Sequence, residues 1–149
     1  MTTTDDVGRG TGGTGGALDR VQAYTIARRL AGEAWGDTQF MIGDPRLTEV
    51  ASQLIRAIGS IGAQIAEGYS RRSRADRIRY YEYALGSTEE AVTWYETARP
   101  VLSAAVLEAR LADLVSIRRL LLTMIRNERA ARSSVRSPPS AEDNARRGK

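Results

Sequence analysis

The sequence predicts an all-α protein, folded as an antiparallel, up-and-down bundle of four helices. Between about residues 17 and 132 the apolar residues recur every three or four positions, and no segment alternates as a β-strand does. The chain has only 4 prolines, most of them outside these periodic segments, so little interrupts the helices. Short connections between four such segments favour neighbours that run in opposite directions.

The first two helices are expected over residues 18–33 and 46–67. The glycines and the proline of the segment 36–45 separate them. In the second helix apolar residues recur at helical spacing from Leu47 to Ile65, which predicts one buried face. Gly68 follows and is expected to be its C-cap.

The third helix is expected to open at Ser73 and to run to about Ala98. Ser73 and Asp76 form a pattern that resembles a capping box, and Pro100 forces the helix to stop. The fourth helix is expected over residues 102–131. The flanking residues 1–16, rich in Gly and Thr, and 133–149, which are basic and contain two adjacent prolines, are expected to be disordered.

Two features indicate that the bundle associates with copies of itself. The third helix carries two apolar lines, and the second of them includes Tyr80 and Trp94, so one buried stripe does not account for both. Gly59 and Gly62 lie inside the second helix, where each costs up to about 1 kcal/mol relative to alanine. Close approach of another helix, within or between subunits, would offset that cost. The alternatives are a third helix covered on two sides and a second helix stabilised elsewhere.

Five arginines crowd the expected start of the third helix. A helix N-terminus already attracts anions, and guanidinium groups add forked donors for phosphate. The cluster is therefore a candidate nucleic-acid site. The alternative is that these arginines pair with carboxylates such as Glu67 or Glu82, within the chain or on another subunit. The cluster consists of Arg71, Arg72, Arg74, Arg77 and Arg79.

Glu67 and Glu90 are expected near the inner edges of their helices. Carboxylates facing each other in a bundle can hold two iron ions, but such sites also use a Glu-x-x-His motif, and the chain has no histidine. The better interpretation is a structural one, in which each carboxylate pairs with an arginine and fixes the register of the helices. No metal and no cofactor is predicted.

The absence of two residue types argues against catalysis. Without cysteine there is no thiolate, and without histidine the commonest general base and metal ligand is missing. No apolar run is long enough to span a membrane and no signal peptide is recognisable, so a cytoplasmic protein is expected. Most of the net charge of +4 belongs to the C-terminal residues, which leaves the folded part nearly neutral.

Residues 64–90 resemble a known family signature. A helix ends in I-A-E-G at Ile65 to Gly68, Arg72 with Ser73 and Asp76 follows, and A-x-G-S-x-x-E covers residues 84–90. This pattern is similar to that of the four-helix-bundle proteins known as ribosomal-RNA intervening-sequence proteins. The likeness covers about residues 18–125, although Gln64 stands where the family usually has asparagine.

The resemblance implies a four-helix bundle that assembles as a ring-shaped homopentamer. It also implies kinship with the accessory variability proteins of diversity-generating retroelements, which partner a reverse transcriptase and bind nucleic acid through a basic surface. It supplies no catalytic residues. The sequence thus predicts a non-catalytic, oligomeric accessory protein that contacts RNA or an RNA-handling enzyme. The alternative is a scaffold that contacts only protein.

Overall fold

The computed structural model describes residues 17–134, which form helices joined by short connections. Two short 3-10 helices accompany four long α-helices, which confirms the all-α, four-helix class; no β-strand occurs within this described range. In chain order the elements are η1 (Ala17–Arg20), α1 (Gln22–Thr38), α2 (Thr48–Ser70), α3 (Arg74–Thr97), η2 (Arg99–Val101) and α4 (Ala104–Ser134).

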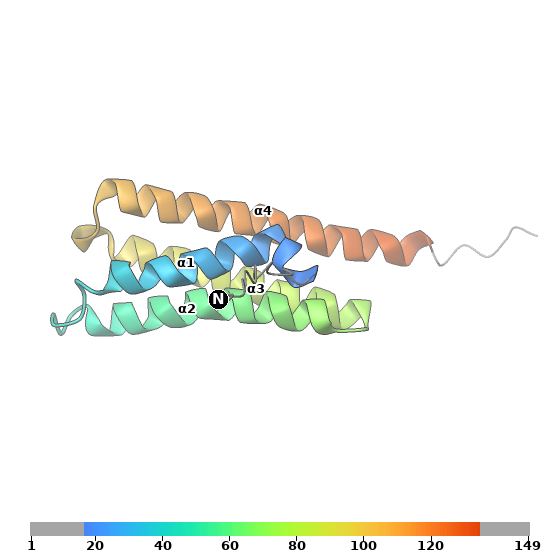
Figure 1. The fold of residues 1–149 in the computed structure, drawn as a ribbon, viewed down its shortest axis with the longest axis horizontal. Coiled ribbons are helices and arrows are strands. Elements are labelled where there is room, and N and C mark those ends of the chain that lie inside the picture. Colours follow the sequence, from blue (N-terminus) through green and yellow to red (C-terminus); the bar gives the residue numbers. More distant parts are fainter. Residues whose placement is uncertain (1–16, 135–149) are drawn as a thin grey trace, which may run out of the picture.

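The four helices run antiparallel to their neighbours along the chain (Figure 1). Helix α3 packs against α2 on one side and α4 on the other, while α1 packs against both α2 and α4. The α1–α2 and α3–α4 connections lie at one end of the bundle and the α2–α3 turn lies at the other, where α4 extends past its neighbours (Figure 1). The up-and-down arrangement follows from these short connections.

The core consists of side chains that recur along one face of each helix. Leu30, Leu54, Ile61, Leu114 and Leu121 are fully buried. Their spacing within each helix is the period of three or four residues that the sequence showed, so burial of one stripe per helix drives the assembly of the bundle.

Two helix ends lie further along the chain than the sequence suggested. Helix α1 continues through Gly36 to Thr38, because its last turn is held by burial of Asp37 and Thr38. Helix α2 continues through Gly68 to Ser70, so the assignment of Gly68 as a C-cap is wrong. Among the described residues only Gly43 has a positive φ, of 125°.

Gly68 instead permits the close crossing of α2 and α3. The residue is buried, and a Cβ atom built there would lie 2.8 Å from Cε1 of Tyr81 and 3.0 Å from Cβ of Tyr80. Only a residue without a side chain fits against this aromatic pair. The glycine therefore determines how closely the two helices approach near their connection.

The second apolar line of α3 is mostly covered within the single chain. Ala84, Ser87 and Ala91 are buried, and Tyr80 and Trp94 at the ends of the line are half-buried. The line lies inside because α3 is sandwiched between α2 and α4. The fold thus agrees with a third helix covered on two sides, and the prediction that Tyr80 and Trp94 contact another copy stays untested.

Residues 17–134 contain no helix that is both long and apolar enough to cross a lipid bilayer. The expectations for residues 1–16 and most of 133–149 concern parts of the chain that lie outside the described residues.

Candidate functional site

The arginine cluster surrounds the α2–α3 turn, and several of its members have partners within the chain. Arg71 pairs with Glu67 and donates to the hydroxyl of Tyr80 at 3.2 Å, with its guanidinium 5.0 Å from the centre of that ring. Arg79 pairs with Asp76 at 3.1 Å. Both guanidinium groups remain partly exposed, so these pairs stabilise the fold little.

Two arginines of the cluster connect the turn to the C-terminal part of α4. Arg77 donates to both carboxylate oxygens of Glu128, at 2.9 and 3.0 Å, and to the backbone carbonyls of Arg71 and Arg72. Arg74 donates to the carbonyl of Ala131 at 2.6 Å. The hydrogen bond to Glu128 raises the pKa of Arg77 above its ordinary value. These two side chains therefore have a structural role at this end of the bundle.

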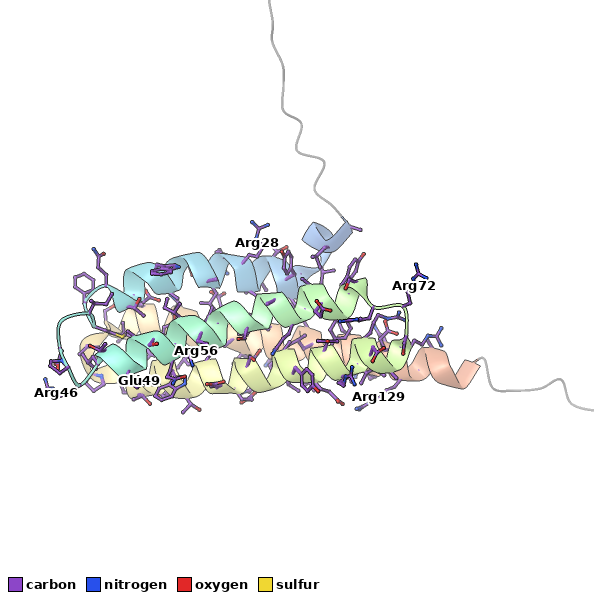
Figure 2. The ribbon with its side chains drawn as sticks, turned by 90° about the horizontal axis from the view of Figure 1, so that it is seen from below. Arg28, Arg46, Glu49, Arg56, Arg72 and Arg129 are labelled. Atoms are coloured by element: carbon purple, nitrogen blue, oxygen red, sulfur yellow. The ribbon has the colours of Figure 1, made fainter. Side chains whose placement is uncertain are left out.

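Arg72 is the exception in the cluster. It is exposed, and its guanidinium makes no hydrogen bond or ion pair with the described residues. Figure 2 shows it projecting from the turn at the end of the bundle. Arg119 and Arg126, on the outer face of α4, are likewise exposed and without a side-chain partner in residues 17–134. Each of these guanidinium groups is available to an external anion.

The charges of the bundle are separated along its long axis. Residues 21–29, 58–87 and 117–131 form the half that contains the α2–α3 turn, and residues 30–57 and 88–116 form the other half. The first half has 11 arginines and 4 acidic residues, hence a net charge of +7; the second has 9 acidic residues and 4 arginines, hence −5. We call them the basic half and the acidic half. The folded part is thus nearly neutral as a whole, although its positive and negative charges are concentrated in opposite halves.

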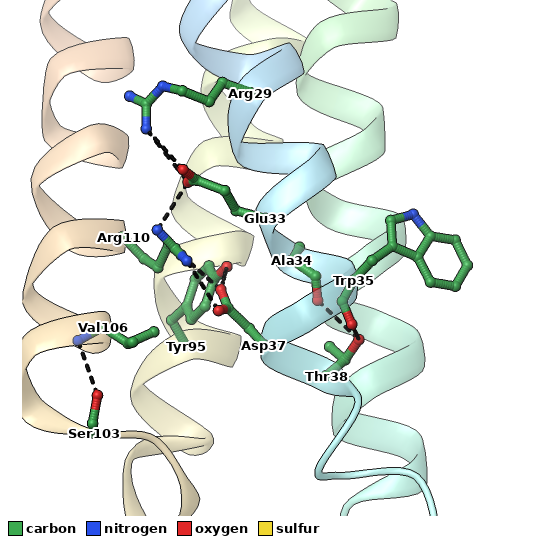
Figure 3. Close-up of polar contacts among 10 residues, drawn as sticks. All are labelled: Arg29, Glu33, Ala34, Trp35, Asp37, Thr38, Tyr95, Ser103, Val106 and Arg110. Carbon is green, nitrogen blue, oxygen red and sulfur yellow. Dashed lines mark hydrogen bonds and ion pairs between the residues drawn. The ribbon is translucent and has the colours of Figure 1, made fainter.

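An ion-pair network that extends from the acidic half to Arg29 of the basic half joins α1, α3 and α4 (Figure 3). Asp37, at the end of α1, accepts hydrogen bonds from the Tyr95 hydroxyl at 2.8 Å and from Arg110 at 2.7 and 3.0 Å. Arg110 also donates to Glu33 at 2.8 Å, and Glu33 in turn accepts from Arg29. Burial of Tyr95 and its hydrogen bond to Asp37 raise the pKa of the phenol.

This network is a structural one that the sequence did not reveal. Asp37 and Arg110 are 73 positions apart, and Asp37 lies in the segment expected to break the first helix. Every buried polar side-chain atom among the described residues has a hydrogen-bond partner, so the network leaves no buried donor or acceptor unpaired. The described residues also bring no three potential metal ligands together.

Glu67 and Glu90 were expected to pair with arginines and fix the register of the helices, and the structure places them differently. Glu67 pairs with Arg71, the C-cap residue of the same helix, and 43% of its side chain is exposed. Glu90 is exposed and accepts a hydrogen bond from the Trp94 indole at 3.4 Å, with no arginine beside it. Among the described residues the buried carboxylate is Asp37, which joins α1 to α3 through Tyr95 and to α4 through Arg110.

The small residues of α2 line a shallow groove beside α1. A Cβ atom at Gly59 would meet nothing within 4 Å, and one at Gly62 would lie 3.9 Å from Cβ of Ala27. The groove has a volume of about 190 Å³ and also contains Tyr24 and Arg28. Close approach within the subunit therefore does not explain these glycines, and the prediction that they contact another copy stays open.

Ser73 is the N-cap of α3. Its hydroxyl accepts a hydrogen bond from the backbone N–H of Asp76 at 3.3 Å. We expect Ser73→Ala to lower the free energy of unfolding by about 1 kcal/mol, the usual loss for such a cap. Urea unfolding followed by circular dichroism measures the effect, with Ser52→Ala, at an exposed position inside α2, as the control. An unchanged midpoint would show that the cap does not stabilise the helix.

The comparisons with known proteins agree with this architecture. A model of the 23S rRNA-intervening sequence protein family matches residues 19–122, which include α1, α2 and α3 and most of α4. The chain is also similar to a crystal structure of a protein of unknown function from the S23 ribosomal protein family of Bacteroides thetaiotaomicron. That similarity has 25% identity and a TM-score of 0.66, and it covers 73% of this chain and 98% of the other. No curated protein matches the chain.

Proposed function

The chain belongs to the 23S rRNA-intervening sequence protein family, and on this premise we propose that it is a non-catalytic, homo-oligomeric binding protein. Its basic half contacts RNA, free or held by an RNA-handling enzyme such as a reverse transcriptase. The observation that carries the proposal is the separation of charge, with +7 on one half and −5 on the other. Such a field attracts a polyanion to one end of the molecule, although the folded part as a whole is nearly neutral.

The unpartnered arginines are the side chains best suited to phosphate. Arg72 at the α2–α3 turn and Arg119 and Arg126 on α4 are exposed and need not break an internal ion pair to bind. Arg74 and Arg77 are instead occupied by the carbonyl of Ala131 and by Glu128. Of the five cluster arginines predicted to bind nucleic acid, we therefore assign direct contact first to Arg72.

Replacing the three unpartnered arginines by glutamine should weaken RNA binding and reduce its salt dependence. Each phosphate contact contributes roughly 0.7 to 0.9 to the slope of log K against log salt concentration, so the triple variant should lose about 2 from that slope. Fluorescence anisotropy with a labelled RNA hairpin over a range of salt concentrations measures both effects. The triple variant is Arg72→Gln, Arg119→Gln and Arg126→Gln.

Two controls distinguish RNA contact through these three arginines from general electrostatic attraction of RNA to the protein. Arg56→Gln removes an exposed, unpartnered arginine of the acidic half and should leave affinity nearly unchanged. Deletion of residues 135–149 removes four basic residues beyond α4. If binding survives the triple substitution and disappears with that deletion, the basic half is not the RNA-binding surface.

The alternative function is a scaffold that contacts only protein. The internal pairing of Arg71, Arg74, Arg77 and Arg79 favours it, because those guanidinium groups already have partners within the chain. A scaffold would show no salt-sensitive affinity for the RNA hairpin in the same titration.

A further inference from the structure

The most exposed large apolar side chains of the described chain lie in one short segment of the acidic half. Phe40 is 82% exposed, Ile42 68% and Trp35 67%. They belong to the last turn of α1 and to the connection that leads into α2. Several adjacent apolar side chains left in water indicate a surface that another molecule covers.

Phe40 and Ile42 are held in place by an ordered turn. Met41 between them is fully buried, and its backbone N–H donates to the carbonyl of Thr38 at 2.9 Å. Asp44 then accepts hydrogen bonds from the backbone and the guanidinium of Arg46, which lowers the pKa of its carboxyl to about 2. A turn fixed in this way presents an apolar projection at little entropic cost to binding. We call Phe40 and Ile42 the apolar tip.

An apolar groove lies in the basic half, between α1 and α4. Its volume is about 340 Å³, which accommodates an aromatic side chain. Tyr69, 42% exposed, stands at its edge. The apolar lining of the groove consists of Val21, Ala23, Tyr69, Tyr81, Leu120 and Met124, and the polar side chains of Gln22, Asn127 and Glu128 complete it.

The charges around the tip and the groove are complementary. The tip belongs to the half with a net charge of −5. Glu49 lies in the first turn of α2, just after the connection, and has no arginine partner among the described residues. The groove belongs to the half with +7, and Glu128, the charged side chain of its lining, is paired with Arg77. Contact between two identical ends would bring like charges together, whereas contact between opposite ends brings unlike charges together.

We infer that copies of this chain associate head to tail, with the apolar tip of one copy in the α1–α4 groove of the next. This inference rests on the self-association in the proposed function and assigns a surface to it. The contact uses two different patches, so it continues from copy to copy until a ring closes or a filament forms. Contacts through the Gly59–Gly62 groove on the side of the bundle can coexist with it.

Two complementary variants test the contact. Phe40→Ser removes the larger side chain of the tip and keeps the groove, while Tyr69→Glu adds a repelling charge at the groove and keeps the tip. We expect each variant alone to associate at least about 30-fold more weakly than the unaltered protein, since loss of a central contact residue commonly has an effect of that size. When mixed, the two variants should form one complex whose mass is the sum of theirs, because one intact tip meets one intact groove.

Sedimentation velocity at low and high salt measures these masses. Tyr83→Ser, at an aromatic residue of α3 that is 51% exposed and lies in neither patch, is the matched control and should behave as the unaltered protein does. Met124→Glu is a second groove variant, and circular dichroism verifies that each variant folds.

Variants that keep the full mass, or a mixture that forms no complex, would overturn the inference. Neither result would alter RNA binding by the arginine variants, so failure here is distinguishable from failure of the proposed RNA contact.

Discussion

Replacing Asp37 by alanine should lower the free energy of unfolding by about 3 kcal/mol, as is usual when one partner of a buried ion pair is removed. The substitution leaves the buried Tyr95 hydroxyl without its acceptor and Arg110 with Glu33 alone. Only 15% of the Arg110 side chain is exposed, so water does not replace the lost carboxylate well. Urea unfolding at neutral pH measures the change.

A control in the same network distinguishes burial from the number of contacts. Arg29 pairs with Glu33 and Asp113, but 51% of its side chain is exposed. Arg29→Ala should therefore change stability by at most about 1 kcal/mol. Asp37→Leu combined with Arg110→Met should recover part of the loss, because an apolar pair leaves no unpaired buried charge. Equal effects of Asp37→Ala and Arg29→Ala would contradict a buried role for Asp37.

Gly68→Ala should destabilise the protein by roughly 1 to 3 kcal/mol, the usual range for an overpacked core. The added methyl group would lie 2.8 Å from the ring of Tyr81, which is buried and cannot move freely. Alanine is favoured over glycine by up to about 1 kcal/mol inside a helix, so propensity alone predicts the opposite sign. Thermal and urea unfolding decide between the two.

Gly86→Ala is the matched control. Gly86 lies inside α3, it is exposed, and a Cβ atom there would meet nothing within 4 Å. This variant should be as stable as the unaltered protein or more stable by up to about 1 kcal/mol. If Gly68→Ala stabilised the protein to the same extent, the close crossing of α2 and α3 would not depend on Gly68.

Local signals account for the parts of the fold that the sequence predicted well. Ser73 caps α3 through the N–H of a residue three positions away, and α3 ends just before Pro100. Such signals act within one or two turns and need no knowledge of neighbouring helices. The ends of α1 and α2 were less predictable, because contacts with other helices outweigh the local preference of Gly36 and Gly68 to interrupt a helix.

The placement of charge shows the same limit. The counts of acidic and basic residues showed that the folded part is nearly neutral. They could not show that the charges lie at opposite ends of the bundle. That separation arises because antiparallel packing brings the second half of each helix beside the first half of the next (Figure 1).

The sequence by itself determined the all-α class and four helices with one buried stripe each, because helical periodicity and capping are read from neighbouring residues. Only the tertiary structure decided which guanidinium groups are free, since that of Arg77 pairs with Glu128 across 51 positions while that of Arg72 pairs with none of the described residues. It also decided that Asp37 is the buried carboxylate and that Gly68 permits a close crossing. Pairing and close packing between distant segments depend on how the helices dock, and no local pattern encodes that geometry.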